Sequence, residues 1–196
     1  MKIVIATNNM HKLKEYRSLF SETTLEVLSI NDININAEID ETGESYEENS
    51  TIKADHIAKL TNLLVIADDS GIEIETLGSS PGINSSRFAS HYQNQTEANQ
   101  AILESLSNVA NRNAKFVCVI ALANYQKETQ LFRGECPGKI LFQAEGKGGF
   151  GYDPIFYSHE AEQCFAKLST KQKNRFSHRG KAVKKLIEFL KTENII

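Results

Sequence analysis

A run of five apolar residues, 63–67, leads without interruption into Asp68, Asp69, Ser70 and Gly71. A strand exposed on one face alternates apolar and polar residues, so an unbroken apolar run predicts a strand covered on both faces of a sheet. We expect this strand to end at the two aspartates, with Gly71 permitting a sharp change of direction. Adjacent side chains of a strand point to opposite faces, so only one of the two carboxylates can face a given site. The alternative is that the aspartates only begin a turn, as in most Asp-Asp-Ser-Gly strings.

Hydrophobic periodicity predicts alternating strands and helices in the N-terminal third of the chain. Residues 2–6 and 25–30 are predicted strands, and residues 10–20 are a predicted helix because apolar residues recur there at helical spacing. Ser45 and Glu48 form a capping box, which predicts the start of a second helix. This second helix is expected to end near Leu60. The apolar residues expected on its buried side are Ile52, Ile57, Ala58 and Leu60.

The rest of the chain predicts more strands than helices. The expected elements are a half-exposed strand at 72–77, a loop over 78–89 that turns at Pro81-Gly82, a helix at 97–106, strands at 115–123 and 129–134 that form a hairpin across 124–128, a further strand at 139–144, a flexible loop at 146–151, and a final helix at 177–191. Strands and helices alternate early and strands cluster later. A mixed α/β sheet therefore fits better than a fully parallel one.

The composition narrows the classes of partner. The chain has 196 residues, enough for one large domain or for two lobes that share a sheet. Its formal net charge is −3, and charges of both signs are interspersed, which argues against a protein built around duplex DNA or an anionic membrane surface. No apolar run approaches the ~20 residues needed to span a bilayer, and the N-terminus does not resemble a signal peptide. We therefore expect neither a nucleic acid nor a membrane partner.

The three cysteines, Cys118, Cys136 and Cys164, are odd in number and lack the spacing of metal ligands. Reduced thiols are therefore expected, as is usual in a cytoplasmic protein. Cys118 lies within an apolar run and is expected to be a small core residue.

Residues 7–12, Thr-Asn-Asn-Met-His-Lys, lie between the first predicted strand and helix and form a candidate anion site. Such a turn presents backbone N–H groups and the positive end of the helix dipole, and both favour an anion. Thr7, Asn8 and Asn9 add side-chain donors, and Lys12 lies in the first helical turn. The alternative is that an asparagine caps the helix and that Lys12 is an ordinary surface lysine.

Glu41 and Asp69 form the best candidate metal pair. Glu41 lies in the acidic segment 33–42, a predicted loop or edge segment, and Asp69 lies on the predicted strand. One or two carboxylates, with water and phosphate completing the shell, are the ligands that Mg²⁺ prefers. Glu44 and Glu48 are also near in sequence, but Glu48 already has a capping role. The histidines show no zinc spacing, so a zinc hydrolase is not expected.

The segment 148–154, Gly-Gly-Phe-Gly-Tyr-Asp-Pro, carries candidate contacts to a nucleotide base. Its glycines let the backbone approach a flat ligand, on which Phe150 or Tyr152 could stack. Asp153 could accept a hydrogen bond from a ring N–H. The alternative is an ordinary glycine-rich hairpin loop anchored by its aromatic residues.

His178 and Arg179 lie in the first turn of the last predicted helix, close after Lys173. A cation there opposes the helix dipole, and so it usually has an anion or a polar ligand to pair with. Arg87 is a similar candidate. The alternative for each cation is a salt bridge at the surface, worth under about 1 kcal/mol.

Six strings occur in the order and at the spacing of a known enzyme family. They are ATNNMHKLKE, ETGESYEEN, ADDSG, PGINSSRFA, GGFGYDPIF and SHRGKA. Together they resemble the inosine triphosphate pyrophosphatase family, the non-canonical purine NTP pyrophosphatases, and the likeness covers nearly the whole chain. Two departures are small: Ser86 replaces a usual alanine, and Cys136-Pro137 replaces a usually less rigid pair, where the proline could alter the edge of the hairpin.

This resemblance implies a two-lobed α/β fold on a long mixed β-sheet with flanking helices, a nucleotide cleft between the lobes, and a homodimer. It implies hydrolysis of ITP, dITP and XTP to the monophosphate and pyrophosphate, with Mg²⁺ as cofactor, so that these nucleotides are removed from the precursor pool. We expect residues 1–196 to form one such domain.

The resemblance also implies roles for individual residues. Asp69 is expected to be the general base and a Mg²⁺ ligand, with Glu41 as the second ligand. The residues expected to contact the triphosphate are Thr7, Asn8, Asn9, Met10, His11, Lys12 and Lys173. Those expected to shape the substrate site and to recognise the base are Ser70, Phe150, Gly151, Tyr152, Asp153, His178 and Arg179.

The hydrogen-bond pattern of the base can provide selectivity. Hypoxanthine and xanthine offer O6 as an acceptor and N1–H as a donor, whereas adenine reverses both. A donor from Arg179 or the backbone, with Asp153 as an acceptor, would leave buried groups unpaired against adenine, and such mismatches discriminate strongly.

Two other functions remain open from the sequence. A pyrophosphatase of the related septum-inhibition type would act on modified pyrimidine or methylated nucleotides, although the GFGYDP and SHR strings argue against it. A nucleotide-sensing module without chemistry would be expected to lack the carboxylates of Glu41 and Asp69.

Overall fold

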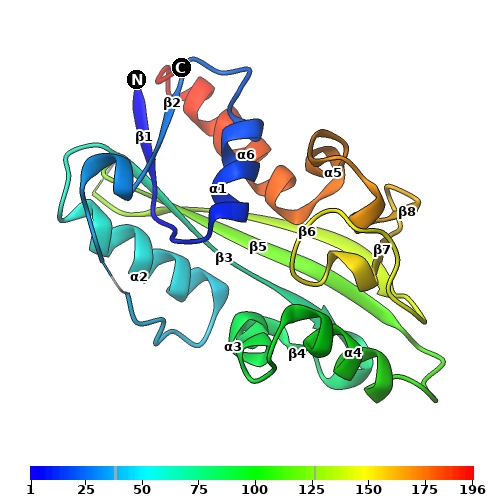
Figure 1. Cartoon of the computed structure of the whole chain (residues 1–196). Coiled ribbons are helices and arrows are strands. Elements are labelled where there is room, and N and C mark those ends of the chain that lie inside the picture. Colours follow the sequence, from blue (N-terminus) through cyan, green and yellow to red (C-terminus); the bar gives the residue numbers. More distant parts are fainter. Residues whose placement is uncertain (38, 126) are drawn as a thin grey trace. The chain divides into compact units, whose positions relative to one another are not determined.

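One mixed sheet organises the computed structural model, which describes residues 1–37, 39–125 and 127–196 (Figure 1). The strands are β1 (Lys2–Ile5), β2 (Glu26–Ser29), β3 (Leu64–Ile74), β4 (Ser80–Pro81), β5 (Asn113–Ala123), β6 (Gln130–Ile140), β7 (Phe156–Ser158) and β8 (Gln163–Cys164). Their order in the sheet is β2-β1-β3-β5-β6-β7-β8, and β4 pairs with β3. Strand β1 is parallel to β2 and β3, whereas the β3–β4, β6–β7 and β7–β8 pairs are antiparallel. The predicted mixed α/β fold is confirmed.

Six α-helices accompany the sheet in the described ranges. They are α1 (Met10–Leu19), α2 (Tyr46–Ala58), α3 (Ser85–Ser90), α4 (Gln95–Ser105), α5 (Thr170–Phe176) and α6 (His178–Thr192). Polar side chains fix where several of them begin, because each accepts a hydrogen bond from a first-turn N–H: Asn9 for α1, Ser45 for α2, Asn94 for α4 and Ser169 for α5. In the described part of the chain, no helix has both the length and the apolar character needed to cross a membrane.

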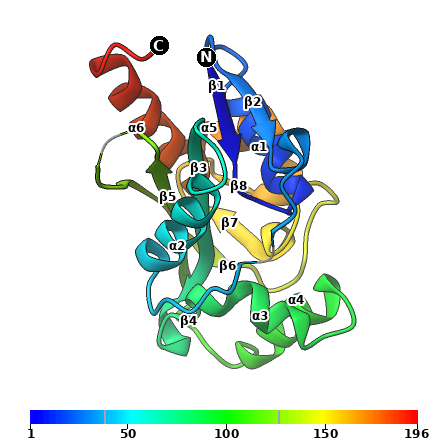
Figure 2. The same cartoon turned by 90° about the vertical axis from the view of Figure 1, so that its left-hand side faces the viewer.

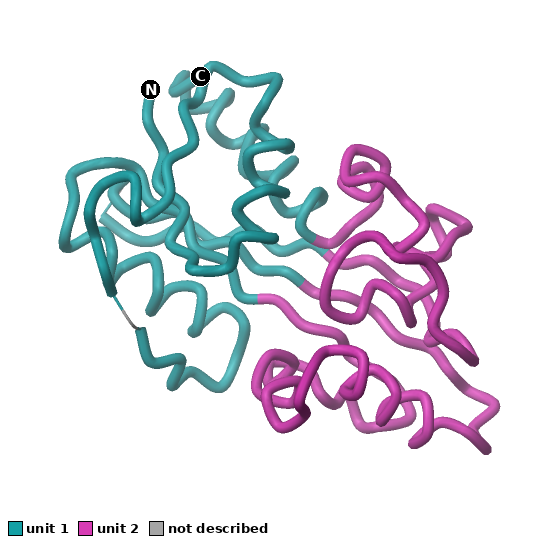
Figure 3. The backbone as a smooth tube through the Cα atoms, in the orientation of Figure 1, with its two compact units in different colours: residues 1–69, 118–134, 179–196 teal, residues 70–117, 135–178 magenta. Residues whose placement is uncertain are grey.

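The chain forms two compact units (Figure 3). Unit 1 comprises Met1–Asp69, Cys118–Gly134 and Arg179–Ile196, and unit 2 comprises Ser70–Val117 and Glu135–His178. Strands β3, β5 and β6 contribute residues to both units. A nucleotide cleft between two lobes and a single catalytic domain over the whole chain stay predictions.

In unit 1, helices cover the sheet on both faces (Figures 1 and 2). Ile66 of β3 packs in one core cluster with residues of α1 and α6, such as Tyr16 and Leu186. Val65 and Ala67 pack in another cluster with Ala54 and Ile57 of α2. The side chains of β3 therefore alternate between the α1–α6 layer and the α2 layer, as the period of a strand requires.

The core of unit 2 is built around α4 and a group of aromatic rings. Ile102, Leu103 and Leu106 of α4 belong to one buried cluster with residues from β3, β5 and β6. Phe116 lies edge-on to Phe156, with ring centroids 4.6 Å apart, which is a favourable aromatic arrangement. This cluster also contains Tyr152 and so includes part of the glycine-rich segment.

The aspartates do not end a strand, contrary to the prediction. β3 continues through them to Ile74, so residues 72–74 of the strand predicted at 72–77 are its continuation, and Glu75–Leu77 form a 3₁₀ helix. Gly71 does not provide a sharp exit. A Cβ atom at Gly71 would lie 2.1 Å from the carbonyl oxygen of Gly82 and 2.6 Å from Oγ of Ser85. Its lack of a side chain allows close backbone packing, which the sequence pattern alone does not distinguish from a turn.

Several other predicted boundaries differ from the structure. The loop predicted over 78–89 contains α3, which is too short to show a periodic pattern, and α5 was not predicted. The strands predicted at 129–134 and 139–144 are one strand, β6, which ends at Ile140 and contains Pro137. The segment predicted as a loop over 33–42 and the turn predicted across 124–128 each include one position, 38 and 126, outside the described residues. The first strands, the first helix, α4, β5 and α6 agree with prediction to within a few residues.

The buried face of helix α2 is more polar than predicted, and of the four residues predicted on it only Ile57 is buried. Ile52 and Ala58 are only partly buried, and Leu60 is exposed. The other buried residues of α2 are Tyr46, Asn49, Ser50, Lys53 and Ala54. The capping box is also only half formed, since Ser45 accepts from the Glu48 N–H whereas the Glu48 carboxylate accepts from the Glu44 N–H. Buried polar side chains need partners, and β3 supplies one of them.

Candidate active site

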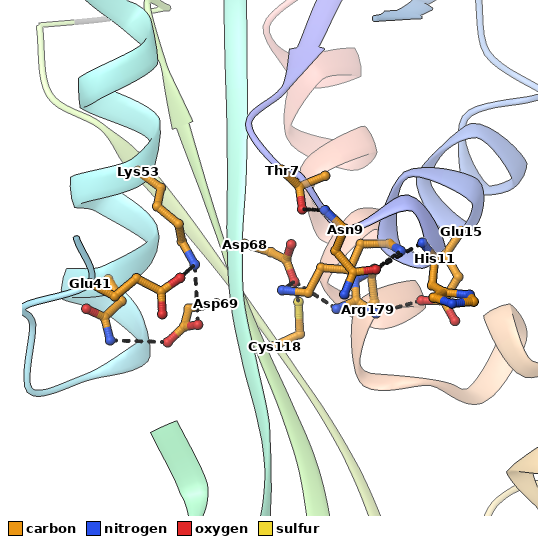
Figure 4. Close-up of polar contacts among 12 residues, drawn as sticks. Thr7, Asn9, His11, Glu15, Glu41, Lys53, Asp68, Asp69, Cys118 and Arg179 are labelled. Carbon is orange, nitrogen blue, oxygen red and sulfur yellow. Dashed lines mark hydrogen bonds and ion pairs between the residues drawn. The ribbon is translucent and has the colours of Figure 1, made fainter. Parts of the chain in front are cut away.

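Asp68 and Asp69 point to opposite sides of β3 (Figure 4). They continue the alternation of residues 65–67, so Asp68 faces the α1–α6 layer and Asp69 faces α2. Both residues are buried, with 2% and 5% of their surface exposed. The prediction that only one of the two carboxylates can face a given site is confirmed.

The Asp69 cluster consists of Asp69, Glu41, Lys53 and Asn49, all in unit 1. Lys53 Nζ lies 2.6 Å from Glu41 Oε1 and 3.4 Å from Asp69 Oδ1. Asn49 Nδ2 donates to Asp69 Oδ2 at 3.4 Å. Two carboxylates from distant parts of the chain therefore converge on one ammonium group, as Figure 4 shows. The structure brings together the two residues predicted as metal ligands.

Asn49 also holds the loop that carries Glu41. Its Oδ1 accepts the backbone N–H of Gly43 at 2.8 Å while its Nδ2 contacts Asp69. A Cβ atom at Gly43 would lie 2.7 Å from the Cβ of Glu48, so this backbone runs close against α2. One amide side chain thus couples the acidic loop, the helix and the strand.

Burial raises the pKa of Asp69, and the nearby Glu41 carboxylate raises it further against the opposing effect of Lys53. The pKa of Lys53 is raised, because the attraction of Asp69, Asp68 and Glu41 outweighs the burial of its ammonium group. A carboxylate with a raised pKa accepts a proton more readily near neutral pH. Asp69 therefore has the chemical character of a general base.

The Asp68 cluster has a different composition. Asp68 Oδ2 lies 3.0 Å from Lys12 Nζ and 2.8 Å from Arg179 Nη2, and Arg179 Nη1 lies 2.6 Å from Glu15 Oε2. Burial alone would raise the pKa of Asp68, but Lys12 and Arg179 hold it well below its usual range. The Cys118 thiol donates to the same oxygen at 3.7 Å, and burial raises its pKa, so Cys118 is a core residue as expected. Asp68 is therefore ionised near neutral pH and fixes the positions of Lys12 and Arg179.

The turn over residues 7–12 is capped by its own side chains. Asn9 Oδ1 accepts the N–H groups of His11 and Lys12 at 2.9 and 3.1 Å, and Thr7 Oγ1 accepts the N–H of Asn9 at 3.1 Å. The alternative that an asparagine caps the helix is confirmed, whereas Lys12 is not an ordinary surface lysine because it pairs with buried Asp68. Its ammonium group is held in place, so little conformational freedom would be lost on contact with a phosphate.

In unit 2, two predicted site residues form a buried ion pair. Asp153 Oδ2 lies 2.7 Å from Lys173 Nζ and also accepts the Phe150 N–H at 2.9 Å. Asp153 and Lys173 are 1% and 3% exposed. Lys173 Nζ lies 4.7 Å from the centroid of the Phe150 ring, which adds a cation–π contact. Lys173, which was predicted to contact the triphosphate, is thus paired with Asp153, which was predicted to recognise the base.

Three further predicted residues lie in different surroundings. His178 stacks on Phe116 in unit 2, with ring centroids 4.6 Å apart and planes 11° apart. Arg179, which follows it in the chain, is 1% exposed in the Asp68 cluster of unit 1, so the expectation that this cation has an anionic partner is confirmed. Ser70 is partly buried on β3. Their contacts to a nucleotide stay predictions.

Lys53, Asn49 and Glu15 were missed as site residues. Asn49 and Lys53 are four residues apart on one predicted helix, and so they share a face. Finding that face buried required the structure, because its polar residues resemble those of a solvated surface. Among the described residues there is no group of three or more His, Cys, Asp or Glu side chains placed to hold a metal ion. Asp69 and Glu41 are thus a two-carboxylate arrangement, which suits a cation that keeps most of its ligands from water and phosphate.

Comparison with known proteins places the chain in a family. A model of the Ham1 family matches residues 3–189. The dITP/XTP pyrophosphatase of Bacillus anthracis is 42% identical over 191 residues, which cover 95% of each chain. The dITP/XTP pyrophosphatase of Clostridium perfringens is 39% identical over 198 residues, which cover 97% of each chain.

Solved structures agree with the sequence comparison. The Ham1 protein of Staphylococcus aureus superimposes with a TM-score of 0.86 at 38% identity, over 98% of this chain and 100% of that one. A nucleoside-triphosphatase, described as a dITP/XTP pyrophosphatase, from Mycobacterium abscessus gives a TM-score of 0.73 at 36% identity, over 95% and 98% of the two chains. The resemblance carried by the six sequence strings is thereby confirmed, and the chain belongs to the Ham1 family.

Proposed function

We propose that this protein hydrolyses non-canonical purine nucleoside triphosphates, ITP, dITP and XTP, to the monophosphate and pyrophosphate. Relatives that bear the name dITP/XTP pyrophosphatase align with nearly the whole chain at 39–42% identity. The observation that carries the proposal is the Asp69 cluster, in which a buried carboxylate with a raised pKa shares one cation with Glu41. This is the equipment for water activation beside a polyphosphate, and a binding module would not need it.

We propose Mg²⁺ as the cofactor, held by Asp69 and Glu41. The fit rests on the donor set: both side chains offer hard carboxylate oxygens, and both already lie within 3.4 Å of one cationic atom, Lys53 Nζ. A divalent cation held by these two carboxylates would also stabilise the ionised form of Asp69, which burial disfavours. When bound, Mg²⁺ neutralises charge on the phosphate oxygens.

The chain's own residues account for the remaining steps. Asp69 orients a water molecule and accepts its proton as the water attacks the α-phosphorus in line with the leaving pyrophosphate. Lys53 keeps Asp69 and Glu41 oriented before substrate arrives. Lys12, anchored by Asp68 at 3.0 Å, stabilises the charge that develops on the pyrophosphate.

The wider set of substrate contacts follows the family resemblance. In this proposal the triphosphate is bound by Thr7, Asn8, Asn9, Met10, His11, Lys12 and Lys173. The base is recognised by Ser70, Phe150, Gly151, Tyr152, Asp153, His178 and Arg179. The proposal also includes a homodimer and a cytoplasmic location.

The decisive experiment is product analysis with labelled water. Purified protein is incubated with ITP and Mg²⁺ in H₂¹⁸O, and the products are separated and analysed by mass spectrometry. Attack on the α-phosphorus places ¹⁸O in IMP and leaves pyrophosphate unlabelled. Release of inorganic phosphate, or label in pyrophosphate, would contradict the proposal.

A substrate panel separates this function from the septum-inhibition type. We expect ITP, dITP and XTP to be hydrolysed much faster than ATP, GTP and modified pyrimidine triphosphates, and we expect EDTA to abolish all turnover. A preference for a modified pyrimidine or methylated nucleotide would assign the protein to the other type. Binding without turnover of any of them would favour a sensing module.

A further inference from the structure

The segment that is expected to recognise the base contains a tight turn at Phe150–Asp153. The Asp153 N–H donates to the Phe150 carbonyl at 3.2 Å, which closes the turn. Gly151 has φ +62°, and Tyr152 has φ −89° and ψ 4°, the pattern of a type II′ turn with glycine in its first central position. Asp153 closes the turn a second time, since its carboxylate accepts the Phe150 N–H. The ends of the turn are therefore fixed by the turn itself.

The central peptide of this turn, between Gly151 and Tyr152, is held by a residue of α4. Asn99 Nδ2 donates to the Gly151 carbonyl oxygen at 3.1 Å. Asn99 is 4% exposed, and its own Oδ1 accepts from Gln95 Nε2 at 3.0 Å, which directs the amide nitrogen toward the turn. The Tyr152 ring is fixed separately, because its hydroxyl donates to the Ser85 carbonyl at 2.6 Å. Neither contact touches the ion pair of Asp153.

The orientation of that peptide determines where a backbone donor points. In a planar trans peptide the C=O and N–H groups point in opposite directions. With the Gly151 carbonyl held toward Asn99, the Tyr152 N–H is directed away from it. In the described residues this N–H has no acceptor, although Tyr152 is only 6% exposed. A backbone N–H without a protein acceptor is a donor that a ligand can use.

We propose that Asn99 is a positioning residue for base selectivity: it fixes the Gly151–Tyr152 peptide so that the Tyr152 N–H donates to O6 of a 6-oxopurine. This inference rests on the proposed function. Adenine carries an amino group, itself a donor, at the same place, so the two donors would face each other and neither would be paired. Without Asn99 the central peptide loses its only side-chain tether in the described part of the chain, and the N–H is no longer held for the oxo group.

The test compares ITP with ATP in Asn99→Asp and Asn99→Ala. Asn99→Asp keeps the size of the side chain but places an oxygen against the Gly151 carbonyl, and Asn99→Ala removes the tether. In both we expect KM for ITP to rise and the ratio of kcat/KM for ITP over ATP to fall about tenfold, with kcat for ITP within a few-fold of the unmodified protein. Gln95→Ala removes the hydrogen bond that orients Asn99 and a contact to the Tyr152 hydroxyl, and it should shift the ratio in the same direction.

The matched control is Gln100→Ala on the same helix. Gln100 is exposed, and among the described residues its side chain hydrogen-bonds only to Glu104. Its removal should therefore leave the ratio unchanged. Melting temperatures are measured for every variant. If the Asn99 variants lose activity toward ITP and ATP in equal proportion, or keep the original ratio, Asn99 is only structural and the inference is overturned. If the unmodified protein does not convert ITP to IMP and pyrophosphate, the proposed function fails instead.

Discussion

Asp68 and Asp69 occupy consecutive positions of β3, and their carboxylates lie in different layers of unit 1 (Figure 4). Asp68 contacts two cations, Lys12 and Arg179, whereas Asp69 shares one cation, Lys53, with the carboxylate of Glu41. Burial raises the pKa of both residues. At Asp68 the two cations outweigh burial, and at Asp69 burial and the neighbouring carboxylate outweigh the single cation.

The difference shows that local charge balance separates an anchor from a reactive group. A carboxylate held by two cations stays ionised and has a low affinity for a proton or a further cation. A carboxylate that shares one cation with a second carboxylate is short of positive charge, and so it favours both a proton and a divalent ion. The alternation of one strand is sufficient to place both types next to each other in the sequence.

The largest expected effect is on turnover in Asp69→Asn. The change keeps the shape of the side chain and removes the proton acceptor, so kcat should fall about 10³-fold or more. The loss of stability should be smaller than that of Asp68→Asn, because Lys53 retains Glu41 as a partner. Pyrophosphate release measures the first quantity, and binding of ITP by calorimetry verifies that the site is intact. Turnover within tenfold of the unmodified protein would show that Asp69 is not the base.

The second prediction reverses the pattern at Asp68→Asn. Removing this carboxylate leaves Arg179 and Lys12 without their shared anion, and breaking such a buried network costs about 3–5 kcal/mol of unfolding free energy. Urea denaturation followed by circular dichroism measures this loss. The comparison between the two aspartates fails if Asp68→Asn is as stable as the unmodified protein and loses only turnover.

A third prediction concerns pH, because the pKa shifts of the two aspartates have opposite signs. The folded pKa of Asp68 is lower than its unfolded value of about 3.9, so its stabilisation is present above that pH and is lost as the pH falls toward the folded pKa. The stability difference between the unmodified protein and Asp68→Asn should therefore shrink steadily below about pH 4. Denaturation curves at several pH values check this.

For Asp69 the folded pKa is raised, so its ionised form is lost at a higher pH than an ordinary carboxylate. In the protein without Mg²⁺, the Asp69 carboxyl should therefore titrate above about pH 4, as NMR of the side-chain carboxyl carbons can follow. The signal is assigned by its absence from Asp69→Asn, and titration below that value would contradict the prediction.

The smallest expected effect is that of Glu41→Gln. Glu41 is the more exposed partner of Lys53, with 35% of its side-chain surface accessible, so its loss should change stability little. The Mg²⁺ concentration needed for half-maximal activity should rise about tenfold. Glu44→Gln is the matched control, since Glu44 is an exposed glutamate three residues further along the chain. Equal Mg²⁺ requirements in the two variants would remove Glu41 from the metal site.

The sequence predicted the fold class and several elements because their patterns are local. The apolar run before Asp68 and the spacing of apolar residues in α1 and α6 depend only on strand and helix periods. The predicted end of β3 was wrong because Gly71 can serve either a turn or a close backbone approach. Only the tertiary position of Gly82 decides between these two roles.

The candidate site was predictable where motifs carried it and not where burial decided it. Asp69 and Glu41 were found as a pair, and Lys12 was placed beside the first helix. Lys53 was missed because a lysine on a helix is usually solvated, and its burial depends on the two carboxylates that meet it. The partner of Lys173 could not be predicted either, since sequence spacing gives no distance between α5 and Asp153.

The inward polar face of α2 sets a limit on how this protein can be engineered. Apolar residues of similar volume often stabilise a fold when they replace a buried ion pair together, so exchanging Lys53 and Asp69 jointly for methionine and leucine would be expected to harden unit 1 while abolishing chemistry. A library selected only for resistance to heat would therefore accumulate variants that are stable and inactive. Any directed-evolution campaign on this scaffold therefore needs a catalytic screen in every round.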